Sequence, residues 1–463
     1  MTPSQSVLGA NMSHDSPNAA LNAAVAEVER RYVKANPISR RRYDTACGFM
    51  PGGNTRSVLH YSPFPLTMGR GHGPWLWDVD GHRYADFLGE YTAGLYGHSH
   101  PVIVRALRAA LDGGLVLGAP NRFEAELAGH LCRRFPSCEL VRFCNSGTEA
   151  NLMAIGAARA ATGRSHVMVF EGGYHGGVLY FAHGPSPVNA PFPCVMGRYN
   201  DLDATLERMR PHAKELAAIL VEPMMGAGGC IPGDPSFLQG LRDAASEHGI
   251  ALIFDEVMTS RLSGGGLQRK LGITPDLTTF GKYLGGGLSF GAFGGGERFM
   301  GLFDPRRPDA LPHAGTFNNN VLSMAAGAAG LGEVFTEEAA DALSGRGDAL
   351  RQRLRACGER NGVTVQVTGA GSIMSLHYQS TPIARPEDTE ATPGAVRKLT
   401  HLELIERGYV TARRGFMSLS LALSDAEIDG FVSALDDVLA THADALRAAP
   451  APRLEAVPAE TSQ

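Results

Sequence analysis

The sequence lacks the features typical of membrane, secreted and nucleic-acid-binding proteins. None of its apolar runs approaches the roughly 18 to 20 residues that cross a bilayer. Its first residues contain no basic region followed by an apolar one, so a secretory signal is not expected. With a net charge of −5, the chain has no excess of positive charge to attract phosphate backbones. We predict a cytoplasmic protein with no membrane or nucleic-acid partner.

Paired cysteines are missing as well. The seven cysteines are odd in number and scattered, and none forms a C-x-x-C pair, which argues against a disulfide framework and a zinc site. His98 and His100, in "GHSH", are close enough to suggest metal ligands, but no acidic or cysteine partner in the sequence completes a set. We predict no metal site, and a helix that starts before Pro101.

Helical segments and short apolar strands alternate between about residues 100 and 300, for example "LVRFC", "HVMVF", "LAAILVE" and "IALIFDEV". This alternation predicts an α/β fold with a mostly parallel sheet covered by helices on both faces. Ligands of such sheets bind at the carboxyl ends of the strands. Residues 340–447 predict a second, smaller α+β unit, and "WLWDVDGHRYADF" predicts two strands about a turn at Asp80 and Gly81.

The chain is long enough for a large domain and a smaller one. The predicted limits are a disordered tail over 1–18, an N-terminal segment over 19–85 that packs with the small domain, a large domain over 86–335, a small domain over 336–447 and a second disordered tail over 448–463.

Polar residues follow three of the predicted strands. Ser146, Gly147 and Thr148 turn from "FCN" into a helix, where free N–H groups and hydroxyls suit a phosphate. Ser146 and Glu149 have the spacing of a capping box, so an ordinary capped helix is the competing interpretation. The absence of G-x-x-x-x-G-K-[ST] excludes a nucleotide P-loop.

Two charged residues end neighbouring strands. Asp255 follows five apolar residues and should be a buried carboxylate, which needs a positive or hydrogen-bonding partner. Lys282 lies among glycine, aromatic and small apolar residues, where burial would lower the pKa of its amine and make it a better nucleophile. A structural salt bridge for Asp255 and a lysine that reaches solvent are the alternatives.

A phosphate cradle, a buried carboxylate and an amine at successive strand ends together match the needs of pyridoxal 5'-phosphate. The chain resembles the fold-type I, class III pyridoxal-phosphate aminotransferases from about residue 45 to 440. "NSGTEAN", "GGYHG", "LVEPMMG", "IFDEVMT", "FGKYLGGGLSFGAFGG" and "AGTFNNN" stand in the order and spacing of that family. The resemblance implies that fold, this cofactor and a homodimer with shared active sites.

The resemblance also implies roles for single residues. Lys282 would bond to the cofactor aldehyde and later carry a proton, and Asp255 would keep the pyridine nitrogen protonated. Further cofactor contacts would be Ser146, Gly147 and Thr148 at the phosphate, Tyr174 and Val257 on the two ring faces, Glu222 near the ring substituents, and Thr316 from a second subunit at the phosphate.

Within class III, "NTRSVL", "EYTAGLYGHS", "DEVMTSRL" and "RRGFMSLSL" resemble the β-amino acid (β-phenylalanine type) aminotransferases. Such an enzyme must bind a carboxylate of the donor and an acceptor such as 2-oxoglutarate. The rigid fork of arginine suits carboxylates, and the resemblance places Arg56 and Arg414 over the cofactor. Tyr91 is expected to line the pocket for an aromatic side chain.

Two other interpretations stay open, and a third pattern is set aside. "PGG" and "GKYLGGGLSFGAFGG" also resemble glutamate-1-semialdehyde 2,1-aminomutase, although the substrate-side strings differ from that enzyme. A catalytically silent homologue would keep the fold without the chemistry. "GLSFG" satisfies G-x-S-x-G, but glycines stand on both sides of Ser289 where a nucleophile elbow needs a strand and a helix.

Overall fold

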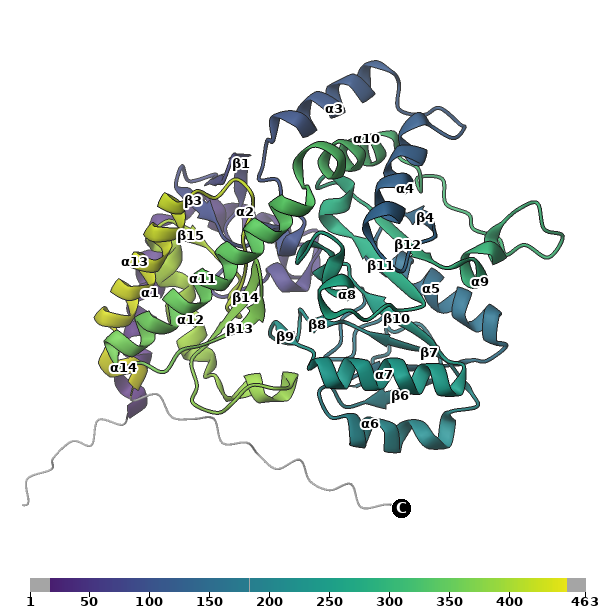
Figure 1. Ribbon diagram of the computed structural model, residues 1–463. Coiled ribbons are helices and arrows are strands. Elements are labelled where there is room, and N and C mark those ends of the chain that lie inside the picture. Colours follow the sequence, from purple (N-terminus) through teal and green to yellow (C-terminus); the bar gives the residue numbers. More distant parts are fainter. Residues whose placement is uncertain (1–16, 183, 448–463) are drawn as a thin grey trace, which may run out of the picture.

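A seven-stranded sheet forms the centre of the larger part of the molecule (Figure 1). The structure, a computed structural model, describes residues 17–182 and 184–447. The strand order is β4 (Leu140–Cys144), β12 (Gly291–Gly295), β11 (Leu277–Gly281), β10 (Ala251–Asp255), β7 (Leu216–Val221), β5 (His166–Phe170) and β6 (Cys194–Gly197). β12 is antiparallel to both of its neighbours, and the β11–β10, β10–β7, β7–β5 and β5–β6 pairs are parallel. The prediction of a mostly parallel sheet is confirmed.

Helices cover both faces of this sheet because successive strand residues point to opposite sides. Val167 and Val169 of β5 pack with the small residues of α5 (Gly147–Thr162), whereas Met168 packs with the cluster that contains Leu238 and Leu241 of α7 (Pro235–His248). Figure 1 shows α7 and α6 (Leu202–Met209) on one side and α5 on the other. The predicted α/β fold is therefore confirmed.

β12 was not expected, because "GAFGG" has few of the branched residues that favour strands. Its glycines are required by close packing. A Cβ at Gly291 would lie 2.1 Å from the carbonyl oxygen of Ser146, and one at Gly295 would lie 2.5 Å from that of Asp276. The strand thus fits between β4 and β11 through backbone contact instead of through side-chain packing.

A smaller α+β unit lies beside the large sheet (Figure 1). Its three-stranded sheet has the order β13 (Gln366–Ala370), β14 (Ile373–His377), β16 (Phe416–Ser418). The helices of this unit are α11 (Glu337–Asn361), α12 (Gly394–Glu406), α13 (Asp425–Thr441) and α14 (Ala443–Arg447).

The N-terminal part forms a meander of β1 (Met68–His72), β2 (Trp75–Asp78) and β3 (Arg83–Asp86). The predicted turn at Asp80 and Gly81 joins β2 to β3. β15 (Tyr409–Val410) adds to β3 in parallel, and α1 (Pro17–Ala35) packs against α12. The remaining elements are α2 (Pro37–Cys47), α3 (Pro101–Asp112), α4 (Arg122–Arg134), β8 (Met224–Met225), β9 (Ile231–Pro232), α8 (Gly266–Leu271), α9 (Glu297–Met300) and α10 (Val321–Ala329).

The predicted tails fall almost wholly outside the described residues. α1 begins at Pro17, so its first two residues lie within the predicted first tail, and α14 ends at Arg447, one residue before the predicted start of the second tail. The other domain limits stay predictions. No helix within residues 17–182 and 184–447 is long and apolar enough to cross a bilayer.

Candidate active site

The carboxyl ends of the central strands bring most of the predicted cofactor residues together. Asp255 is the last residue of β10, Glu222 follows β7, and Lys282 follows β11 directly. Ser146 lies two residues after β4, and Tyr174 four residues after β5. Because these strands run in the same direction, their polar end residues share one edge of the sheet.

Asp255 is held by a buried hydrogen-bond network. Its Oδ2 accepts from Asn151 Nδ2 at 2.8 Å and lies 2.9 Å from His175 Nδ1, and its Oδ1 accepts from the Val257 N–H at 3.0 Å. Thr279 in turn donates to Asn151 Oδ1 at 2.8 Å. The carboxylate is 5% exposed. These bonds fix its orientation, which a buried carboxylate requires.

Sequence analysis missed Asn151 and His175. A signal existed for both, because Asn151 lies three residues after Thr148 and therefore on the same face of α5. His175 follows Tyr174 in the motif that was assigned to the cofactor ring.

Lys282 lies beside this network in an unusual backbone conformation. Its φ is 56°, in the left-handed region that residues other than glycine rarely adopt. Burial lowers the pKa of its amine to about 8, while the carboxylates of Asp255 and Glu222 oppose that shift. A group held in a strained conformation with a lowered pKa is suited to nucleophilic attack on a carbonyl.

The start of α5 lies just beyond the carboxyl end of β4, where the phosphate cradle was predicted. Ser146 Oγ accepts from the Glu149 N–H at 3.2 Å, but the Glu149 carboxylate accepts from the Asn145 N–H at 2.8 Å instead of that of Ser146. The expected capping box is therefore only half formed. A Cβ at Gly147 would lie 2.9 Å from the Val257 side chain, so glycine is the residue that fits at this position.

Thr148 is covered by the segment that carries Tyr174. The Gly177 N–H donates to Thr148 Oγ1 at 3.2 Å, and a Cβ at Gly176 would lie 2.1 Å from the same oxygen. The Tyr174 N–H donates to Glu222 Oε1 at 2.9 Å, and burial raises the pKa of that carboxyl group. Tyr174 itself keeps 44% of its surface exposed, so its ring can cover a ligand.

The predicted substrate residues form a cation–aromatic stack. The guanidinium carbons of Arg56 and Arg414 lie 5.6 Å and 5.3 Å from the centroid of the Tyr91 ring. Phe416 stacks on Tyr91 at 5.4 Å, and Glu90 pairs with Arg56. The two arginines are thus brought together around one ring, although they are 358 positions apart in the sequence.

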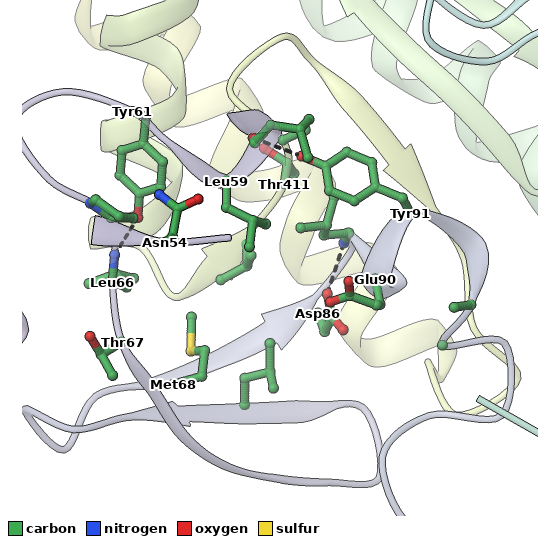
Figure 2. Close-up of a pocket in the computed structure, with 18 of the residues that line it drawn as sticks. Asn54, Leu59, Tyr61, Leu66, Thr67, Met68, Asp86, Glu90, Tyr91 and Thr411 are labelled. Atoms are coloured by element: carbon green, nitrogen blue, oxygen red, sulfur yellow. Dashed lines mark hydrogen bonds between the residues drawn. The ribbon is translucent and has the colours of Figure 1, made fainter. Parts of the chain in front are cut away.

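A cavity of about 870 Å³ opens beside this stack (Figure 2). The N-terminal segment contributes Leu59, Tyr61 and Met68, and the loop after β3 contributes Glu90 and Tyr91. Figure 2 shows Tyr91 and Glu90 on one side of the cavity and Tyr61 with Leu66 on another. The lining is part apolar and part polar, and of the predicted site residues only Tyr91 belongs to it; Lys282, Asp255, Arg56 and Arg414 do not line this cavity.

The turn that carries Tyr91 is supported by Arg261, which sequence analysis left out of the site. Glu90, Tyr91 and Thr92 have φ values of 46°, 52° and 83°, so three residues other than glycine are left-handed in succession. Arg261 is 1% exposed and donates to the carbonyl oxygens of Thr92 and Leu419. A buried cation therefore joins this turn to the smaller unit.

Thr316 does not join the site of its own chain in the described structure. It is exposed in the turn before α10, next to Phe317, which is 65% exposed. Ser289 lies two residues before β12, so a strand follows it where a nucleophile elbow needs a helix.

The two neighbouring histidines have separate structural contacts. His100 caps α3 by accepting from the Val102 N–H, as predicted. The Nε2 of His98 lies 3.1 Å from Asp86 Oδ2, a contact that sequence analysis did not identify. His98 and Asp86 are 12 positions apart in the sequence, and the chain after β3 brings them together.

The arrangement fits pyridoxal 5'-phosphate at three points. An anion would meet the N-terminus of α5, a protonated ring nitrogen would meet the Asp255 carboxylate, and an aldehyde would meet the Lys282 amine. Each of these three cofactor groups would meet a protein group of complementary charge or reactivity.

Comparisons with known proteins agree with this geometry. The aminotransferase class-III family matches residues 58–439. The β-phenylalanine transaminase of Variovorax paradoxus is 52% identical over 425 residues, which are 92% of this chain and 98% of that one. The crystal structure of the Variovorax paradoxus β-phenylalanine aminotransferase has a TM-score of 0.90 and covers 91% of this chain and 98% of its own.

Two further structures extend the comparison. A transaminase with pyridoxal phosphate bound is 32% identical, with a TM-score of 0.82, over 89% of this chain and 99% of its own. A glutamate-1-semialdehyde aminomutase from Pseudomonas aeruginosa PAO1 is 26% identical, with a TM-score of 0.84, over 92% and 99%. The family match, these similarities and the site at the strand ends show that the chain belongs to the class III aminotransferases, which depend on pyridoxal phosphate.

Proposed function

We propose that this aminotransferase moves the amino group of an aromatic β-amino acid to a 2-oxo acid such as 2-oxoglutarate. The observation that carries the proposal is the pair of arginines on the Tyr91 ring, with Arg414 close enough to Lys282 to add to the effect of burial in lowering the pKa of its amine. The 52% identity to a β-phenylalanine transaminase supports the same donor class.

When bound, the cofactor supplies an aldehyde that accepts the amino group and a ring that withdraws electrons from the substrate carbon. Lys282 is assigned the attack on that aldehyde and the transfer of the proton at the substrate carbon, through its Nζ. Asp255, oriented by Asn151 and His175, is assigned the stabilisation of a proton on the ring nitrogen.

The remaining site residues are assigned the binding and orientation of the cofactor. Ser146, Gly147 and Thr148 would hold the phosphate at the start of α5. Tyr174 and Val257 would enclose the ring, and Glu222 would position the Tyr174 segment through its backbone bond.

Arg56 and Arg414 are assigned the carboxylates of donor and acceptor. Arg414 is half-buried over both Tyr91 and Phe416, whereas Arg56 is exposed and paired with Glu90. A half-buried guanidinium suits a carboxylate that binds in both half-reactions. An exposed one can exchange Glu90 for a substrate carboxylate.

We further propose a homodimer in the cytoplasm. Val116 is 92% exposed and Phe317 is 65% exposed. Their segments are joined, because Asn121 Nδ2 donates to the Asn319 carbonyl at 2.8 Å. An exposed apolar patch of this kind is typical of an interface, and in such a dimer Thr316 would reach the phosphate of the partner. The seven cysteines are all free, as in a reducing compartment.

Incubation of the purified enzyme with racemic β-phenylalanine and 2-oxoglutarate tests the proposed reaction. We expect glutamate to accumulate together with the 3-oxo acid. Turnover of glutamate 1-semialdehyde without glutamate formation from β-phenylalanine would favour the aminomutase. A protein that neither binds the cofactor nor turns over any amine would be a silent homologue.

A further inference from the structure

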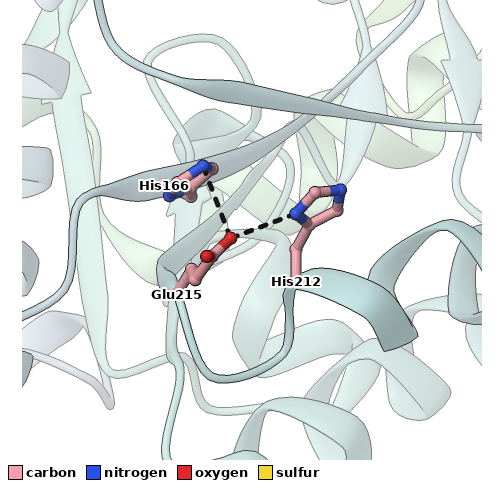
Figure 3. A group of neighbouring side chains, drawn as sticks. All are labelled: His166, His212 and Glu215. Carbon is pink, nitrogen blue, oxygen red and sulfur yellow. Dashed lines mark hydrogen bonds and ion pairs between the residues drawn. The ribbon is translucent and has the colours of Figure 1, made fainter.

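Three polar side chains from separate segments meet at the amino ends of two neighbouring strands (Figure 3). His166 begins β5, His212 ends the short 3-10 turn Arg210–His212, and Glu215 directly precedes β7. Glu215 Oε2 lies 3.2 Å from His212 Nδ1 and 3.6 Å from His166 Nε2. The three atoms all lie within 4.8 Å of one another.

We propose that His166, His212 and Glu215 bind a divalent transition-metal ion of the Zn²⁺ type. Two imidazoles and one carboxylate are ligands that Zn²⁺ accepts, whereas Mg²⁺ and Ca²⁺ prefer oxygen alone. In a tetrahedral zinc site with bonds of about 2.0–2.1 Å, neighbouring ligand atoms lie about 3.4 Å apart. The two carboxylate–imidazole separations, 3.2 Å and 3.6 Å, lie on either side of that value.

A hydrogen-bond partner of His166 outside the three residues also suits a metal site. Ser165 Oγ lies 3.1 Å from His166 Nδ1. If the neutral imidazole donates its Nδ1–H to this hydroxyl, Nε2 keeps a lone pair that faces Glu215. Metal-bound histidines are oriented in this way by a hydrogen bond at the other ring nitrogen.

The backbone holds the three segments in place. His166 pairs with Leu216 in the parallel β5–β7 ladder, so the register places Glu215 beside it. The Glu215 carbonyl accepts from the His166 N–H at 3.0 Å, and the Glu215 N–H donates to the His212 carbonyl at 2.8 Å. Arg164 Nη1 donates to the Leu216 carbonyl at 3.1 Å. The backbone positions of the three residues are therefore fixed, which lowers part of the entropic cost of binding.

The proposed metal has a structural effect and no part in transamination. β5 and β7 each separate it from the active site by a full strand, about 15–20 Å at the usual rise per residue. The ion would join the starts of two adjacent strands and stabilise the folded state by binding it selectively. The proposal does not depend on the amino donor.

Calorimetric titration of the EDTA-treated, desalted holoenzyme with ZnCl₂ tests the site. We expect one Zn²⁺ per chain and a higher Tm at saturating Zn²⁺. His212→Ala and Glu215→Gln should each weaken binding by at least about tenfold, because even the loss of an outer-shell partner has an effect of 10- to 100-fold. His72→Ala, at an exposed histidine of β1, and Cys47→Ser, at an exposed thiol, are the controls and should bind as the wild type does.

Melting curves without Zn²⁺ establish that each variant is folded. Transaminase activity should be unchanged in Glu215→Gln, whether or not the proposed donor is correct. The proposal is overturned if the wild type takes up no Zn²⁺, or if both ligand variants retain wild-type affinity and stoichiometry. Loss of binding only in Cys47→Ser would likewise overturn it, because the ion would then belong to the thiol.

Discussion

The two edges of the central sheet hold similar kinds of polar side chain in different surroundings. At the carboxyl edge Asp255 and Glu222 are each 5% exposed, and the charges near Lys282 act on one another through protein. At the amino edge the Glu215 side chain is 55% exposed and that of His212 is 43% exposed. Electrostatic interactions are strong where water is excluded and weak where it is not. The same strands thus carry a reactive site at one end and a solvated one at the other.

The largest expected difference between the edges comes from Lys282→Ala. Loss of the group that bonds the cofactor and moves the proton should lower kcat by about 10³-fold or more, because positioned proton transfer alone contributes 10²- to 10⁴-fold. The visible absorption of the lysine-bound cofactor should disappear as well. Steady-state kinetics and absorption spectra of the variant, with Lys270→Ala in α8 as the control, measure both effects. Near-wild-type turnover in Lys282→Ala would contradict the assignment of the active site to this edge of the sheet.

Replacement of two aspartates, one at each edge of the sheet, tests the comparison of the edges more sharply. Asp255→Asn should lower kcat about 10²- to 10³-fold, the usual loss when one preorganised electrostatic group is removed. Asp276, at the amino edge, accepts from Arg242 and from the Leu252 N–H, both at 2.8 Å. Asp276→Asn should instead lower the free energy of unfolding by about 1–3 kcal/mol.

Kinetics and urea unfolding of both aspartate variants make this test. An Asp276→Asn enzyme that is folded and has lost as much kcat as Asp255→Asn would show that the two edges are not functionally distinct.

Arg414→Lys is expected to have a smaller effect. Removal of a charge-assisted bidentate contact should raise KM for the β-amino acid about 10- to 100-fold, since hydrogen bonds to charged groups contribute about 1.5–3 kcal/mol. Arg56→Lys should have less effect, because Arg56 is exposed and already paired with Glu90. KM values for donor and 2-oxoglutarate in both variants provide the measurement. Equal KM values in wild type and both variants would exclude the arginines from substrate binding.

The smallest expected effect is a pH dependence of stability in the cofactor-free enzyme. The folded-state pKa of Lys282 is lowered to about 8, below the value of about 10.4 for an unfolded lysine. The unfolded chain therefore binds more protons between about pH 8 and 10, and the contribution of this lysine to stability rises with pH in that window and is absent below it.

Tm measured from pH 7 to 10 checks this sign. The difference between wild type and Lys282→Met should grow in favour of the wild type above about pH 8. Lys270→Met, at an exposed lysine in the last turn of α8, is the matched control. A flat difference for Lys282→Met would mean that the lysine is solvated.

Much of the site could be predicted because its residues lie at strand ends. Asp255 follows a short apolar run and Lys282 follows a short predicted strand, and both local patterns are visible without knowledge of the fold. The contacts of Asp255 with Asn151 and His175 depend on how α5 and the loop after β5 pack over β10. β12 was missed because its glycines are required by close contact with residues far away in the sequence, such as Ser146 and Asp276.

The sequence alone determined the α/β class, the alternation of strands and helices, and the side chains that stand at the strand ends, because each of these depends on neighbouring residues. Tertiary structure decided which of these side chains meet. Arg56 and Arg414 share the Tyr91 ring, and His166 faces Glu215, only through packing and strand register. Such contacts join distant segments, and their geometry follows from how the whole chain buries its apolar surface.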